Sequence, residues 1–403
     1  MAVTSAKFSR AGTKPRMRPA GKGTRIIKND LDGVLLGVVI ALLVIGILMM
    51  FSASYPAAIE DGMSGTYYAT RQLAFAGAGL VLMGILSVVP YQFFSKLWVS
   101  GSAFAASVIM LILVLIPGVG KTVNGATRWI QFGGDGGITF QPSEMMKIAI
   151  VLFFSMLIIR NEHRMKTFWY GIVPYMLMLG LIAGLMMKEP HLSGTLIIGV
   201  LALTLIFVGG ARPTHFAILI AVGAVGLTVV VLYLMHSKGI GYFQNRILSW
   251  LDPFNEKYMQ DETWQTCQSL IAIGSGGMFG LGLGASRQKY QYLPEAQNDF
   301  VFAILCEEFG FVGAFTVILL FCLLVFRGFY IAAKAKDKFG MLVAVGFTMH
   351  IGLQALLNIA VVSNAIPNTG ISLPFFSYGG TALMMQLAEM GVLLNISRQA
   401  KLD

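Results

Sequence analysis

Long apolar runs separated by short polar loops dominate the pattern of this 403-residue chain. A helix needs about 20 apolar residues to cross ~30 Å of hydrocarbon, and runs of that order recur along most of the sequence. The pattern therefore predicts an all-α polytopic membrane protein with about ten transmembrane helices. The expected spans are residues 33–54, 73–90, 100–117, 143–160, 168–187, 193–209, 215–235, 300–326, 341–363 and 380–396.

Basic residues outside these spans predict the orientation, because cytoplasmic loops carry an excess of Lys and Arg. The basic N-terminal tail shares its side with basic loops after the fourth, sixth and eighth spans and with the C-terminus. We therefore expect residues 1–30 to be a disordered basic cytoplasmic tail, 31–398 a single membrane domain and 399–403 a cytoplasmic C-terminus. A long, partly helical loop, 236–299, then lies outside the cell between spans 7 and 8.

Composition narrows the class of protein. Hydrophobic residues make up 56% of the chain and charged residues 12%, about half the charged fraction of a soluble globular protein. The net charge of +10 is concentrated in the tail and in particular loops, which indicates contact with anionic membrane lipids and not with nucleic acid. Three cysteines and five scattered histidines predict neither a disulfide framework nor a metal cluster.

The junction between the long loop and the eighth span concentrates carboxylates. An ionised group facing hydrocarbon costs at least a few kcal/mol, so Asp299 should face protein or water, and such a residue is a functional candidate. It could instead only cap the eighth span by accepting hydrogen bonds from free amides. Glu307 and Glu308 lie about two to three turns farther along, so we expect them to be hydrogen-bonded or paired with a cation.

Basic residues also lie in outer loops, against the charge bias, and six of them are candidates for one site. Any one of them could be a solvated loop charge, but gathered near one carboxylate they would bind a polyanion such as pyrophosphate. They are Lys121, Arg128, Lys188, Arg246, Arg287 and Lys289. Two other features have structural interpretations: Glu144 and Lys147 could pair with each other on one helix, and the glycine-rich segment 274–284 favours close backbone packing or a re-entrant turn.

Several spaced segments together resemble one known family. They are NGATRWI (124–130), FQPSEMMK (140–147), QSLIAIGSGG (268–277), the run from 280 to 310 that contains LPEAQNDF, and NTGISLPFFSYGG (368–380). In this order they resemble the SEDS family of cell-wall polymerases, FtsW, RodA and SpoVE. Ser372, where RodA-type proteins tend to have proline, and the long basic tail make the chain most similar to the FtsW type.

The resemblance implies a function, partners and a location. The function is that of a peptidoglycan glycosyltransferase, which polymerises lipid II at the outer face of the bacterial cytoplasmic membrane during septal synthesis in cell division. The implied partners are a class B penicillin-binding protein transpeptidase and regulatory membrane proteins of the divisome.

The resemblance also implies site residues. The family's essential aspartate falls on Asp299, and other positions shared with the family pattern are Lys147, Arg246, Gln288, Lys289, Glu295 and Ser377; Arg128, in the first matching segment, joins them as a substrate-binding candidate. The chain departs from the pattern at Thr263-Trp264, where the family usually has Gly-Tyr, and at His191, where the family has an acidic residue. We therefore assign no role to His191.

Lipid II polymerisation requires the 4-hydroxyl of an acceptor sugar to attack the anomeric carbon of a donor that leaves as a lipid pyrophosphate. A carboxylate at the membrane edge can accept the hydroxyl proton, because partial desolvation raises its pKa toward the working pH. We expect Asp299 to be this base, the cations of Arg246, Lys289 and Lys147 to stabilise the leaving group, and the anomeric centre to be inverted. A divalent cation, Mg or Mn, could bridge the pyrophosphate.

Other functions stay open at this point. A lipid II flippase would also have many spans with charges at membrane depth, although a carrier site belongs near the midplane between broken helices. A RodA-type elongation polymerase shares the same motifs. A non-catalytic scaffold that recruits a penicillin-binding protein would not need Asp299. For a polymerase, we expect a groove between the eighth span, the long loop and the fourth span.

Overall fold

The computed structural model of the protein describes residues 30–123, 126–132, 137–189, 191–221, 223, 250–255 and 263–400. The predicted tail, most of the seventh predicted span, Arg246 and much of the long outer loop lie outside the described residues.

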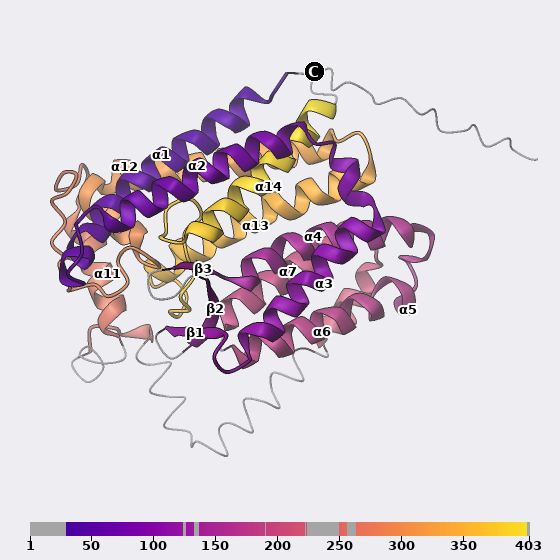
Figure 1. The fold of residues 1–403 in the computed structure, drawn as a ribbon, viewed down its shortest axis with the longest axis horizontal. Coiled ribbons are helices and arrows are strands. Elements are labelled where there is room, and N and C mark those ends of the chain that lie inside the picture. The colour runs from indigo at the N-terminus through magenta and orange to yellow at the C-terminus, as the bar shows by residue number, and fades with distance from the viewer. Residues whose placement is uncertain are drawn as a thin grey trace, which may run out of the picture.

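Helices make up most of the described chain and run alongside one another in a bundle (Figure 1). They are α1 (Gly33–Glu60), α2 (Tyr67–Val88), α3 (Leu97–Val114), α4 (Pro142–Arg160), α5 (Phe168–Gly171), α6 (Val173–Lys188), α7 (Leu192–Val208), α11 (Trp264–Ser275), α12 (Val301–Ala333), α13 (Lys338–Val362) and α14 (Gly380–Gln399). Two short 3₁₀ helices, Tyr91–Ser95 and Glu162–Arg164, connect spans at the same end as the C-terminus.

The prediction of an all-α polytopic membrane protein is confirmed. Seven segments of the described chain are long and apolar enough to cross a membrane, namely α1, α2, α3, α4, α5 with α6, α12 and α13, and α7 is a shorter apolar helix. Helix bounds differ from the predicted spans where polar residues extend a helix, as at the start of α2, because hydropathy marks the hydrocarbon segment and not the helix end. Residues of α4 and α13 are mostly buried, so these two helices form the interior of the bundle.

A small sheet in the segment between α3 and α4 was not expected. Strands β1 (Gly120–Val123), β2 (Ala126–Phe132) and β3 (Ile138–Phe140) form an antiparallel sheet in the order β1-β2-β3, with Ile130 of β2 opposite both Gly120 and Phe140. The sheet lies at the end of the bundle away from the C-terminus (Figure 1). It presents Arg128 to the interior of that end.

Helix α12 is interrupted at Gly310, whose φ of 64° and ψ of −162° are not helical. The interruption frees carbonyl groups of the first half, and the glycine-rich segment satisfies them: the amides of Leu281 and Gly282 donate to the carbonyls of Glu307 (2.9 Å) and Glu308 (3.0 Å). A Cβ on Gly310 would lie 2.4 Å from the nitrogen of Gly280. The expected close backbone packing of the glycine-rich segment is confirmed.

Candidate active site

A cavity of about 450 Å³ lies at the sheet end of the bundle, among α2, the sheet, the N-terminal ends of α4 and α7, the loop before α12 and residues 370–382. Its walls carry charged and titratable groups of both signs. They are Arg71, Lys121, Arg128, Glu144, Lys147, His191, Glu295 and Asp299. Segments far apart in the sequence therefore gather acids and bases around one space.

Asp299 lines this cavity two residues before α12 begins. Its backbone carbonyl accepts a hydrogen bond of 2.7 Å from the side-chain amide of Asn358, which fixes the chain at the wall. Gly370, at φ 61°, lies so close that a Cβ there would be 3.1 Å from a carboxylate oxygen of Asp299. The helix N-cap is Phe300, with no side-chain capping bond, so the carboxylate faces the cavity and does not cap α12.

The electrostatic setting of Asp299 suits a base. Burial is the largest cause that raises the pKa of Asp299, the neighbouring Glu295 also raises it, and the guanidinium of Arg128 opposes the rise, so that the pKa lies at about 6. A carboxylate with this pKa is ionised near neutral pH and is still basic enough to accept a proton from a hydroxyl that is losing it.

Arg128 lies between two carboxyl groups, since it interacts electrostatically with both Asp299 and Glu189. Its Nε also donates to the backbone carbonyl of Glu189 at 3.3 Å. Burial raises the pKa of Glu189 to about 7, and both of its buried side-chain oxygens lack a hydrogen-bond partner. Arg128 stays protonated in this setting, so it brings a cation close to Asp299.

Two roles were predicted around Glu144 and Lys147: the two residues could pair with each other, and Lys147 could bind substrate. The Lys147 ammonium lies 2.8 Å from a Glu144 carboxylate oxygen, and both side chains are almost fully buried. The pairing that the sequence suggested is therefore present, and both residues also line the cavity. The Lys147 Nζ donates a further hydrogen bond of 3.1 Å to Oε1 of Gln354, on α13.

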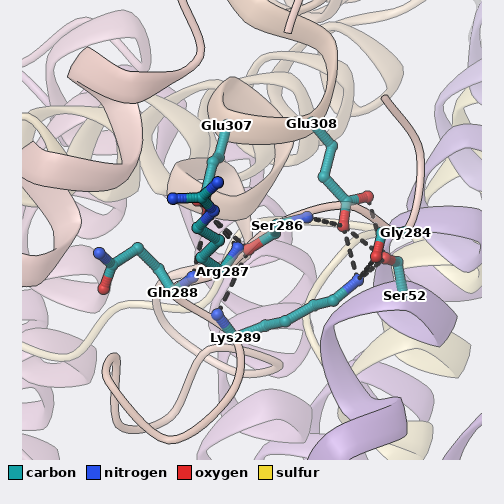
Figure 2. Close-up of polar contacts among 8 residues, drawn as sticks. All are labelled: Ser52, Gly284, Ser286, Arg287, Gln288, Lys289, Glu307 and Glu308. Carbon is teal, nitrogen blue, oxygen red and sulfur yellow. Dashed lines mark hydrogen bonds and ion pairs between the residues drawn. The ribbon is translucent and has the colours of Figure 1, made fainter. Parts of the chain in front are cut away.

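Lys289 lies in a separate buried cluster (Figure 2). Its ammonium donates to a carboxylate oxygen of Glu308 (2.8 Å), to Oγ of Ser52 on α1 (2.9 Å) and to the carbonyl of Gly284 (2.8 Å). Lys289 does not line the cavity with Asp299. The substrate-binding prediction for Lys289, which came from its outer-loop charge and the family pattern, stays a prediction; in the structure its three donors are all used inside the protein.

Gln288 and Glu307 belong to the same cluster (Figure 2). Glu307 accepts hydrogen bonds from the hydroxyl of Ser286 and from the backbone amides of Arg287 (3.0 Å) and Gln288 (3.3 Å). Gln288 does not line the cavity either. The expectation that Glu307 and Glu308 are hydrogen-bonded or paired with a cation is confirmed.

Ser377 and Glu295 shape the loop that carries Asp299. The Ser377 hydroxyl donates to the carbonyl of Asn298 (2.6 Å) and accepts from the amide of Leu373 (2.7 Å), so it ties residues 373–377 to the residue before Asp299. Glu295, at φ 56°, accepts a hydrogen bond from the side chain of Asn298 and lines the cavity. Ser377 supports the site without lining it.

Two cavity residues were missed in the sequence. Arg71 donates to the carbonyl of Gly137 (2.8 Å) and to the hydroxyl of Tyr67 (2.7 Å) from the start of α2. It falls in the predicted outer loop 55–72, so the charge criterion that selected Arg128 could have found it. His191 was set aside as a departure from the family pattern, yet it lines the cavity with a buried Nδ1 that lacks a partner. Burial and Arg128 lower its pKa to about 4, so the ring is neutral.

Among the described residues, no group of three or more His, Cys, Asp or Glu side chains could hold a metal ion. The cavity does contain the two neighbouring carboxyl groups of Glu295 and Asp299. Mg²⁺ in phosphoryl sites is commonly held by one or two carboxylates together with substrate phosphates. These residues therefore fit a cation that substrate oxygens help to bind.

Comparison with known proteins gives consistent matches over most of the chain. A family model described as a cell cycle protein, and named for FtsW, RodA and SpoVE, matches residues 33–402. Stage V sporulation protein E of Bacillus subtilis is 41% identical over 378 residues, 93% of this chain and 99% of that protein. The probable peptidoglycan glycosyltransferase FtsW of Trichlorobacter lovleyi is 38% identical over 376 residues, 93% of this chain and 94% of that protein.

Solved structures of similar fold belong to the same group. One comes from a study of how a peptidoglycan synthase complex coordinates polymerization and crosslinking; it has a TM-score of 0.73 and 27% identity, and the match covers 93% of this chain and 99% of that one. The rod shape determining protein RodA of Thermus thermophilus has a TM-score of 0.65 and 26% identity, over 93% of this chain and 98% of that one.

Proposed function

The chain belongs to the FtsW, RodA and SpoVE family of SEDS peptidoglycan glycosyltransferases, and from this premise we propose that it polymerises lipid II with Asp299 as general base. The observation that carries the proposal is the place of Asp299: a carboxyl group with a pKa of about 6 in a cavity that Arg128 and Lys147 also line.

The reaction step follows from these groups. The Asp299 carboxylate accepts the proton of the acceptor 4-hydroxyl while the hydroxyl oxygen bonds to the anomeric carbon of the donor. The bond from that carbon to the pyrophosphate oxygen breaks, its electron pair leaves with undecaprenyl pyrophosphate, and the anomeric centre is inverted. Since the attacking oxygen becomes more acidic as the bond forms, a base of pKa about 6 is well matched to this transfer.

Cations in the cavity stabilise the leaving group. Lys147 on α4 and Arg128 on β2 both line the cavity, so a polyanion bound there would meet positive charge from two elements. Arg71 adds a third cation from α2. Arg246 lies outside the described residues and stays a prediction. A divalent cation, Mg or Mn, would neutralise pyrophosphate oxygens and would be held by Glu295 and the substrate, which leaves Asp299 to accept the proton.

The orientation and the partner belong to the same proposal. The cavity opens at the outer face of the cytoplasmic membrane, both termini are cytoplasmic, and the protein works with a class B penicillin-binding protein at the division septum. The similarity to a chain of a peptidoglycan synthase complex supports such a partner. The similarity to a sporulation protein and to RodA supports a sporulation or elongation role as the alternative.

A lipid II carrier is less well supported. Helix α12 is broken at Gly310, as carrier helices often are, but the break is filled by hydrogen bonds from the backbone of residues 281 and 282. Beside the break, Glu308 is neutralised by Lys289 and both side chains are almost fully buried. This arrangement leaves the freed carbonyls and the charges satisfied within the chain.

Purified protein in liposomes with labelled lipid II distinguishes the candidates. A polymerase makes glycan chains, and Asp299→Ala and Asp299→Asn lose them while the protein stays folded. A carrier moves labelled lipid II between leaflets without making chains, and a scaffold does neither. Chain synthesis that is unchanged in both variants would remove Asp299 from the chemistry.

A further inference from the structure

A chain of buried polar side chains runs from the cavity into the interior of the bundle. Lys147 and Gln354 line the cavity. Behind them lie His350 on α13 and Glu389 on α14, each 1% exposed, and neither lines the cavity. The contacts are Lys147 Nζ to Gln354 Oε1 (3.1 Å), Gln354 Oε1 to His350 Nε2 (2.9 Å) and His350 Nδ1 to the Glu389 carboxylate (2.8 Å).

The orientation of the Gln354 amide determines which atoms in this chain of side chains donate hydrogen bonds and which accept them. Its Nε2 donates to the carbonyl and to the hydroxyl of Ser372, both at 3.0 Å. A carbonyl only accepts, so the amide nitrogen faces Ser372 and the amide oxygen faces Lys147 and His350. Because an amide oxygen cannot donate, His350 must carry a hydrogen on Nε2.

Glu389 keeps the His350 ring in this state. Both carboxylate oxygens lie within 2.9 Å of Nδ1, so a proton is shared between the ring and Glu389. A carboxylate buried among helices is costly unless it is paired and hydrogen-bonded. The contact between His350 and Glu389 therefore fixes the ring orientation, with the Nε2 hydrogen directed toward Gln354.

Gln354 contacts residues on both sides of the cavity, so the fixed position of the His350 ring also fixes these contacts. One end of its amide holds the Lys147 ammonium, and the other holds Ser372, two residues after the glycine that borders Asp299. We propose that His350 and Glu389 are positioning residues, which act through Gln354 to hold Lys147 and the 370–372 segment in register with Asp299. This inference rests on the proposed function, in which Lys147 meets the leaving pyrophosphate.

Apolar replacement of both partners tests the proposal, because His350→Leu with Glu389→Leu strands neither charge. We expect the double variant to keep its unfolding temperature but to lose on the order of tenfold or more in kcat/KM for lipid II, since small misplacements of a reacting group cost this much. Combined with Lys147→Met, the double variant should lose less than the product of the two separate losses, because both changes act on the Lys147 contact, while the effect on the 370–372 segment remains.

Conservative and control variants separate positioning from packing. Glu389→Gln should retain activity, because its amide N–H can donate to Nδ1 and leave the Nε2 hydrogen facing Gln354. Tyr91→Phe removes a hydrogen bond from another buried side chain, to the exposed Asp337 at 2.8 Å, between elements outside the cavity. It should polymerise lipid II like the native protein.

Native kcat/KM in the double variant, or a loss that multiplies with that of Lys147→Met, would overturn the inference. If the double variant does not fold, Gln354→Met takes its place, with the same loss expected and native activity contradicting it. Native protein that makes no glycan from lipid II would refute the proposed function, and this inference with it. If the native protein polymerises lipid II and the double variant has the native kcat/KM, only this inference is refuted and the proposed function stands.

Discussion

At the scale of single residues, Arg128 moderates the pKa of Asp299. It brings the guanidinium charge that opposes the rise in the Asp299 pKa caused by burial and by Glu295. Its position on a short strand made it hard to relate to Asp299 in the sequence, where the two are far apart. Once the sheet is in place, Arg128, which we propose to bind the pyrophosphate, also opposes the rise in the pKa of the proposed base.

Arg128→Gln should shift the pH dependence of polymerisation. Without the cation the pKa of Asp299 rises above about 6, so at a given pH less of the carboxyl is ionised. Because a base must be ionised to act, the acidic limb of kcat/KM moves to higher pH, and the maximum falls by roughly tenfold to a hundredfold with the loss of leaving-group stabilisation.

Arg160→Gln, at the opposite end of α4, is the control and should leave the limb in place. An acidic limb of kcat/KM that is unchanged or moves to lower pH in Arg128→Gln would contradict the electrostatic coupling between Arg128 and Asp299.

Lys289 and Glu308 allow a test of a structural role against a substrate-binding role. Lys289→Met leaves the fully buried Glu308 without its cation, which should destabilise the protein by about 3–5 kcal/mol. Lys289→Met combined with Glu308→Leu should recover most of that free energy of unfolding. Unfolding in detergent and polymerisation are measured on both. A double variant that is stable but inactive would instead support a substrate-binding role for Lys289.

At the scale of elements, the interruption of α12 holds the glycine-rich loop in place. Hydropathy predicted the span 300–326 correctly as an apolar helix, but it could not reveal the interruption, since a glycine inside an apolar run reads as an ordinary helical residue. One partner of Lys289 could not be predicted for a different reason: Ser52 is 237 positions away in the sequence. Composition identified the buried carboxylates, and only packing assigned their partners.

Gly310→Ala should destabilise the protein. The positive φ and the 2.4 Å approach to Gly280 leave no room for a Cβ, and a non-glycine residue in such a conformation costs about 1–3 kcal/mol before the clash is counted. Gly84→Ala in α2, where a Cβ would meet nothing within 4 Å, is the matched control and should be neutral or slightly stabilising. Thermal unfolding in detergent is the measurement, and equal unfolding temperatures would contradict the account.

At the scale of the whole molecule, the spans and Asp299 could be predicted because each has a local signal. Apolar length reveals a span, and a carboxylate at the mouth of an apolar run is conspicuous. The expected groove was right in part: residues of the long loop and of the start of the fourth span line the cavity, whereas its other walls come from segments between Arg71 and Ala382 that meet only in the folded bundle. Arg71 could have been found by its charge in an outer loop, but His191 has no local signal strong enough to relate it to Asp299.

The orientation of the bundle can be tested by cysteine labelling. In a background with Cys267, Cys306 and Cys322 replaced by alanine, Ser64→Cys in the α1–α2 loop should react with a membrane-impermeant maleimide in intact spheroplasts. Lys336→Cys, in the loop between α12 and α13, should react only after permeabilisation, because basic loops lie in the cytoplasm. The reverse pattern would put the cavity on the cytoplasmic side and exclude extracellular polymerisation.

The central claim is that Asp299 takes the proton of the acceptor hydroxyl. The most direct test is the rate of lipid II polymerisation by the native protein and by Asp299→Asn, measured across the pH range on either side of 6. The account predicts a native rate that falls in proportion to acid below about pH 6, and a variant that folds but keeps only a small residual rate without this dependence. A folded Asp299→Asn variant with the native rate and the native acidic limb would contradict it.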